Sequence, residues 1–224
     1  MVAYHFAFDL NHLGWLRPAQ DFYRDPQWTW QRTAIVGLFL FCAGLGQAIA
    51  WQQGQRWPCF WRRWAQVAAC ALGVSAASWF MFPRSWISFG VLHGMAVMLL
   101  LLRLAAGWMP RRSGWMWPAG ALALVLPLWL AHPLFDTRPT NWLGLVTHKP
   151  VTEDWVPVFP WLGVMLWGYG LGRWLLANRP QILGGTVPPQ FRPWVTLGQW
   201  SLSFYMLHQP VLIGLVLLAT TMRA

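Results

Sequence analysis

Three histidines of this chain lie inside apolar stretches, where an ionisable side chain is costly and therefore suggests a function. His5 occurs in MVAYHFAFDL, His93 in ISFGVLHGMAVMLLLL and His208 in SFYMLHQPVLIGLVLLA. An imidazole binds and releases a proton near neutral pH, and it can also attack a carbonyl carbon as a nucleophile. These histidines are the first candidates for acid–base or acyl-transfer chemistry.

The first of them belongs to a group of three, His5, Asp9 and His12, spaced i, i+4, i+7. On a helix this spacing places all three side chains on one face. A carboxylate one turn from an imidazole fixes its tautomer and raises its basicity, as a general base requires. We therefore predict these three as catalytic residues, with His5 and His12 competing for the role of base. The alternative is that Asp9 and His12 are solvated groups at a membrane interface.

A second stripe with the same spacing is formed by Ser201, Tyr205 and His208, and Gln209 and Pro210 follow it. Pro210 cannot donate to the carbonyl one turn earlier, so a kink is predicted beside the imidazole. Together with His93, the polar residues of this stripe are the predicted substrate-binding set: His93, Ser201, Tyr205, His208 and Gln209. The alternative for each is a structural hydrogen bond, between helices or to a neighbouring carbonyl.

Motifs of several other chemistries are absent from the sequence. It contains no GxSxG, no HExxH, no glycine-rich phosphate loop and no CxxC. The three cysteines have no metal-ligand spacing and are an odd number, so neither a disulfide framework nor a cysteine-bound metal is expected. A zinc site made of the three histidines is conceivable, but no metal site is predicted.

The elements that carry these residues are predicted to be membrane helices. Hydrophobic residues make up 57% of the chain and charged residues only 10%, against about 25% in soluble domains. The 20 tryptophans gather where apolar runs meet polar ones, as expected at membrane interfaces. We predict an all-α polytopic membrane bundle, a single domain over 1–224, with six full transmembrane helices. Their predicted ranges are 31–51, 64–82, 86–106, 115–131, 157–177 and 197–220.

The segment 1–16 is expected to be an additional half helix. Its apolar part, MVAYHFAF, is about half of the length that crosses a membrane. It has neither a positive leading region nor a small-residue cleavage site, so it is not expected to be a signal peptide. We expect it to be the second half of a first helix that is truncated in this sequence.

Loop charge predicts the orientation. The connections 52–63, 103–114 and 173–196 each carry three arginines and no acid, whereas 17–30 and 132–156 are nearly neutral. Positive loops face the cytoplasm, so the 132–156 connection and the C-terminus are expected on the outer face. The net charge of +10 is thus explained by topology, and no nucleic-acid partner is expected. The same loops supply candidate phosphate ligands: Arg62, Arg63, Arg111 and Arg112.

Four stretches occur in this order: MVAYHFAFDLNHLGW, SFGVLHGMAV, VFPWLGVMLWGYGLGRWL and LGQWSLSFYMLHQPVLIGL. Together they resemble bacterial members of the heparan-alpha-glucosaminide N-acetyltransferase catalytic-domain family, over nearly the whole chain. The wider group of type 3 acyltransferases is similar at its first helix, where an Arg and then a His are found. His5 matches that His, while the Arg would precede residue 1.

The resemblance implies a membrane-embedded acetyltransferase of the bacterial inner membrane, with a periplasmic C-terminus. Acetyl-CoA would be the cytoplasmic co-substrate, without a metal, and a sugar hydroxyl or amine on an envelope glycan or lipid-linked sugar would be the acceptor. The expected partners are this acceptor and the lipid bilayer, with a homo-oligomer as a further candidate. The alternatives are a proton-coupled transporter or channel, because buried histidines also serve proton relays, and an inactive truncated fragment.

Overall fold

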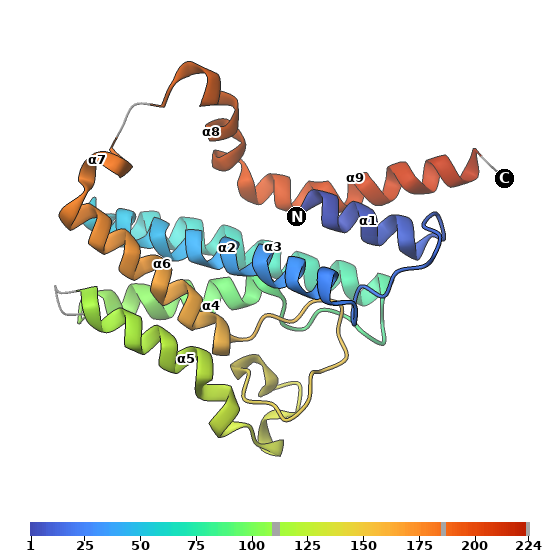
Figure 1. Cartoon of the computed structure of the whole chain (residues 1–224), viewed down its shortest axis with the longest axis horizontal. Helices are drawn as coiled ribbons and strands as arrows, with labels where there is room; N and C mark the ends of the chain where they lie inside the picture. The colour runs from blue at the N-terminus through green and yellow to red at the C-terminus, as the bar shows by residue number, and fades with distance from the viewer. Residues whose placement is uncertain (109–112, 185–186, 223–224) are drawn as a thin grey trace. The chain divides into compact units, whose positions relative to one another are not determined.

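The structure, a computed structural model, describes residues 1–108, 113–184 and 187–222. Helix makes up 74% of it, and no strand occurs among the described residues (Figure 1). The α-helices are α1 (Val2–His12), α2 (Pro26–Gln52), α3 (Trp57–Met81), α4 (Val91–Ala106), α5 (Met116–Leu130), α6 (Val158–Asn178), α7 (Pro180–Leu183), α8 (Arg192–Gln199) and α9 (Ser201–Thr221). Short 3-10 helices are η1 (Ser113–Trp115), η2 (Pro133–Phe135), η3 (Asn141–Leu143) and η4 (Pro189–Phe191). The prediction of an all-helical chain is confirmed.

Three of the helices, α2, α3 and α9, are long and apolar enough to cross a membrane, and α4 and α5 are shorter apolar helices. The predicted count of six full spans and a half helix is therefore not confirmed, although a helix forms in every predicted segment. The predicted span 197–220 is divided at Trp200, where α8 ends and α9 begins. Pro210 lies inside α9, which continues through it.

The start of α4 differs from the prediction for a physical reason. The predicted span begins at 86, but the helix begins at Val91, because the backbone before it is bonded to a distant loop. Phe89 pairs with Trp155 as an isolated bridge, and the Thr152 hydroxyl donates to the Trp86 carbonyl over 3.0 Å. These groups are therefore unavailable for a helical turn.

The described residues divide into two compact units, one comprising residues 1–36 with 187–222 and the other residues 37–108 with 113–184. Helix α2 contributes to both, since the boundary falls between Val36 and Gly37. The organisation as a single domain stays a prediction.

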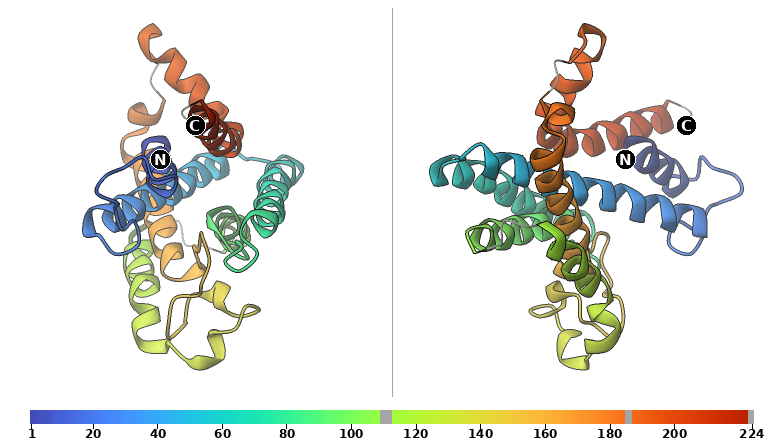
Figure 2. Two further views of the ribbon diagram at one scale, coloured as in Figure 1. Left: turned by 90° about the vertical axis from the view of Figure 1, so that its right-hand side faces the viewer. Right: turned by 60° about the vertical axis from the view of Figure 1, so that its left-hand side comes forward.

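Close approach between helices dominates the second unit, in which α5 packs along α6 (Figure 2). A Cβ atom on Gly163 of α6 would collide with the Gly120 carbonyl oxygen of α5. In the same way, a Cβ on Gly44 of α2 would collide with the Met165 carbonyl, and one on Gly168 of α6 with the Phe41 carbonyl. Small residues let helix backbones come this close. Gly172, four residues after Gly168, faces the same helix, because a Cβ there would lie 2.7 Å from the Ala48 Cβ of α2.

In the first unit, α1 lies beside α9 (Figure 1). Aromatic residues that follow α1 in the chain pack back against this helix. The Phe22 ring, 2% exposed, stacks on Trp28 with centroids 4.1 Å apart, and the Tyr4 ring meets it edge-on at 5.6 Å. Helix α1 is thus held by α9 and by this cluster.

Candidate functional site

Two of the predicted histidines, His5 of α1 and His208 of α9, lie side by side in the first unit. Their ring centroids are 5.1 Å apart, and the ring planes are tilted by 58°. The packing of α1 along α9 brings together residues that are 203 positions apart in the sequence. The structure thus places two groups that can each bind or release a proton next to one another.

His208 has a defined tautomer. Its Nδ1 lies 2.7 Å from the backbone oxygen of Tyr205, and a carbonyl oxygen only accepts, so Nδ1 carries the hydrogen. The Nε2 atom then bears a lone pair. This nitrogen is buried and has no hydrogen-bond partner among the described residues, and the whole side chain is 8% exposed. An oriented imidazole whose unprotonated nitrogen is buried and has no hydrogen-bond partner can act as a base.

Asp9 does not orient His5 in the way that their spacing predicts. Its carboxylate, 5% exposed, accepts from the Gln209 side-chain amide, over 3.0 Å to Oδ1 and 3.3 Å to Oδ2. A buried carboxylate requires donors, and here one amide serves both oxygens. Asp9 and Gln209 therefore join α1 to α9 one turn away from the His5–His208 pair.

The remaining predicted residues of this unit lie at its surface or flank the pair. His12 is exposed at the end of α1, with its ring parallel to that of Phe8 at 6.3 Å. Ser201 is exposed at the start of α9. The Tyr205 ring is 5.8 Å from the His208 ring, and its carbonyl is the group that fixes the tautomer. Of the two competing bases on α1, the structure places only His5 beside another imidazole.

His93 lies in the second unit, and both of its ring nitrogens have partners. Ser75 donates its hydroxyl to the Ile87 carbonyl over 2.6 Å, so its oxygen is free to accept from His93 Nε2–H at 3.1 Å. His93 Nδ1 then accepts from the Gly90 N–H at 3.3 Å, at the start of α4. This favours the structural alternative for His93, whose role in substrate binding stays a prediction.

Of the predicted phosphate ligands, Arg62 and Arg63 are exposed on the first turns of α3. Arg111 and Arg112 lie outside the described residues. A further arginine outside this predicted set, Arg103 of α4, is 5% exposed. It lies 4.9 Å from the ring centres of both Trp51 and Trp57 and donates to the Gln55 carbonyl. Its cage of aromatic rings gives it a structural role.

Within residues 1–108, 113–184 and 187–222, no cluster of three histidine, cysteine or acidic side chains is placed to hold a metal ion. The geometry brings two imidazoles, a carboxylate and an amide together in one unit, which suits proton transfer.

Comparison with known families gives one match. Residues 1–210 match the catalytic domain of heparan-alpha-glucosaminide N-acetyltransferase. No curated protein and no solved structure matches the chain significantly. The matched range includes α1 and the part of α9 that carries His208 and Gln209.

Proposed function

Since the chain belongs to the heparan-alpha-glucosaminide N-acetyltransferase catalytic family, we propose that it transfers acetyl from acetyl-CoA to a sugar amine or hydroxyl at the His5–His208 pair. The single observation that carries this site is the bare, buried Nε2 of His208 beside His5. Membership of the family supports the reaction class, a membrane acetyltransferase.

The chemistry follows from the tautomer of His208. The acceptor nitrogen or oxygen attacks the thioester carbonyl carbon, the new C–N or C–O bond forms, and the C–S bond breaks. The proton of the acceptor goes to His208 Nε2, and the departing thiolate takes up a proton to leave as the free thiol. His5 is adjacent to the imidazolium as it forms and relays that proton to the thiolate sulfur. Acetylation of His5 itself would be the covalent variant of the same reaction.

The donor is proposed to approach from the cytoplasm. The stretch 52–63, which runs from the end of α2 into the first turns of α3, has three arginines and no acid, which supports a cytoplasmic location by the positive-inside rule. Arg62 and Arg63 are exposed there, and a guanidinium matches phosphate oxygens in geometry and charge. We assign them, with Arg111 and Arg112, to the phosphates of acetyl-CoA.

The acceptor is proposed to be an envelope glycan or lipid-linked sugar on the outer face. In this orientation the C-terminal end of α9 faces outward, and α1, which packs against it, ends on the same side. We propose a bacterial inner membrane as the location of the protein.

The test is the transfer of labelled acetyl from acetyl-CoA into envelope material, in inner-membrane vesicles that contain the protein. Wild-type protein should incorporate label, and His5→Ala should lose most of it. His148→Ala, which alters an exposed histidine of the second unit, is the matched control and should behave as wild type. Absence of label in every sample, with the protein shown to be folded, would refute the proposal and make solute flux the next assay.

A further inference from the structure

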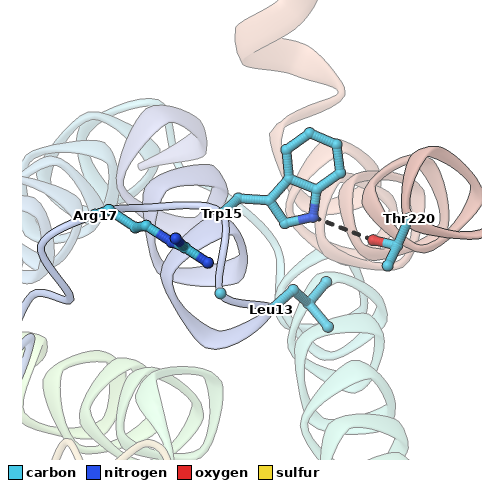
Figure 3. A pocket seen from close by; sticks show the side chains of 5 residues that line it. Leu13, Trp15, Arg17 and Thr220 are labelled. Atoms are coloured by element: carbon cyan, nitrogen blue, oxygen red, sulfur yellow. Dashed lines mark hydrogen bonds between the residues drawn. The ribbon is translucent and has the colours of Figure 1, made fainter. Parts of the chain in front are cut away.

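The first unit contains a pocket of about 310 Å³ beside the ends of α1 and α9. It is lined by Leu13, Gly14, Trp15, Arg17 and Thr220, as Figure 3 shows. Four of these residues follow α1 directly, and Thr220 lies in the last turn of α9. A pocket of this size is within the range that holds small-molecule ligands.

A hydrogen bond across the pocket fixes its aromatic wall. The indole N–H of Trp15 donates to the Thr220 hydroxyl oxygen over 3.1 Å, drawn as the dashed line in Figure 3. The Thr220 hydroxyl itself donates to the Val216 carbonyl over 2.8 Å. With its proton used in this way, the Thr220 oxygen is held as an acceptor, and the indole plane is held with it. A fixed, amphipathic aromatic ring beside polar groups is a suitable surface for a sugar ring.

The charge of the pocket is positive. Arg17 is the one charged residue in the lining, and no ion pair to it occurs among the described residues. The nearby acids already have donors: Asp21 accepts from the Tyr23 and Arg24 N–H groups, and Asp25 accepts from the Asp21 N–H. An arginine fork without a protein carboxylate is suited to bind the oxygens of a carboxylate or phosphate.

The position of the pocket relates it to the histidine pair. Leu13 directly follows the end of α1, the helix that carries His5, and Thr220 is in α9, the helix that carries His208. The pocket and the histidine pair therefore lie along the same two helices, and an acceptor bound in the pocket lies beside the elements that carry the pair.

We propose that this pocket is an acceptor subsite, in which Arg17 binds a carboxylate or phosphate of an anionic saccharide while its sugar ring lies on Trp15. The inference rests on the proposed function for the role of the ligand as acceptor. It specifies the chemical class of the acceptor, which the family match does not.

Binding to purified protein in lipid nanodiscs, without acetyl-CoA, tests the subsite. The probes are glucosamine, glucosamine 6-phosphate, glucuronic acid and inorganic phosphate. Calorimetry or saturation-transfer NMR measures the binding of each. A charge-assisted contact predicts that the two anionic sugars bind about tenfold or more tightly than glucosamine. Comparison of the phosphate sugar with the uronic acid identifies which anionic group the acceptor carries.

Three variants locate the effect. Arg17→Gln should abolish the preference for anionic sugars, Arg17→Lys should keep part of it, and Arg24→Gln should leave it unchanged. Arg24 is the matched control, because it is an exposed arginine of the same connection that does not line the pocket. Since Arg17 is also exposed, all three variants should retain the wild-type circular dichroism.

Equal affinity for the anionic sugars and for glucosamine in wild type, or an unchanged preference in Arg17→Gln, would overturn the proposal. Binding of inorganic phosphate as tightly as of the phosphate sugar would also overturn it, because the sugar would then contribute nothing. These results are separate from those of the acetyl-transfer assay. A preference that depends on Arg17 without any acetyl transfer would refute only the proposed reaction, and acetyl transfer with an unchanged KM in Arg17→Gln would refute only the subsite.

Discussion

At the scale of single residues, the site combines His208, whose Nε2 can act as a base, with the buried carboxylate of Asp9, which the uncharged amide of Gln209 stabilises. His208 Nε2 has no protein partner in the part of the chain that the structure describes, whereas both Asp9 oxygens accept from Gln209. The carboxylate is 5% exposed, so its amide donor is needed for stability as well as for geometry. The two pairs are adjacent on α1 and α9, and damage to one is expected to disturb the other.

The Asp9–Gln209 contact leads to a prediction about stability. Gln209→Leu leaves a buried carboxylate without its donor and should destabilise the protein by about 1–3 kcal/mol. Asp9→Asn added to Gln209→Leu should cost less than the sum of the two single changes, because the buried charge is then removed. Thermal unfolding in detergent measures this cycle. Gln190→Leu, an exposed glutamine in η4, is the control. Strict additivity would contradict the contact.

A pH-dependent contact lies in the connection between α5 and α6. The Thr147 hydroxyl and N–H donate to Asp136 over 2.6 and 2.7 Å, and these bonds hold the pKa of the Asp136 carboxyl below its usual range. The His148 ring, 3.4 Å away, acts in the same direction. Because the folded pKa is depressed, the stabilisation is present above the unfolded pKa, about 3.9, and is lost as pH falls through the folded value.

Carbon-13 NMR of labelled aspartate measures this effect. Thr147→Val removes the hydroxyl donor, so the Asp136 pKa should rise toward its ordinary value. Hydrogen exchange in the connection should then increase at a higher pH than in wild type. Asp136→Asn should show no such pH dependence. A Thr147→Val protein that titrates as wild type does would contradict this explanation.

At the scale of elements, backbone contacts between helices determine where glycine is required. Gly44 of α2 touches the backbone of α6 at Met165, whereas Gly46, two residues later, has open space around it. Gly44→Ala should therefore destabilise the protein by about 1–3 kcal/mol through overpacking. Gly46→Ala should be neutral or slightly stabilising, since alanine favours a helix. Unfolding midpoints in detergent compare the two, and an equal effect at both positions would contradict the packing.

The same elements show what sequence patterns predict well. Each long apolar run predicts a helix, because backbone groups inside a membrane must bond within their own helix. A helix forms in each of these segments. Glycines four residues apart, such as Gly168 and Gly172, favour close helix packing for a similarly local reason. The start of α4 was not predictable, because its preceding residues bond to 152–156, far along the chain.

The candidate site follows the same division. Single histidines in apolar runs were recognisable from the sequence, and two of the three form the pair. The Asp9–Gln209 bond was not predictable, because the i, i+4 spacing pointed equally to His5 and tertiary packing decided between them. Arg17 and Trp15 were missed since nothing local distinguishes them from other interfacial residues; only the ends of α1 and α9 reveal their pocket.

At the scale of the whole molecule, the family match over residues 1–210 and the apolar helices give a membrane acetyltransferase. The first unit supplies the imidazole pair, and the second supplies tightly packed helices and the connection that covers the start of α4. Acetyl transfer at this site requires His208 to act as a base, and not only to fill space in the packing. A packing role would tolerate a side chain of similar size.

The most direct test is acceptor-dependent release of CoA thiol by purified protein in liposomes, with glucosamine and glucosamine 6-phosphate as acceptors. His208→Gln, which keeps polarity and approximate size, should lower kcat by about a hundredfold or more while the protein stays folded. His148→Gln, which changes an exposed histidine of the second unit, is the control and should stay near wild type. Wild-type turnover in folded His208→Gln would contradict a role for His208 as the base that takes the acceptor's proton.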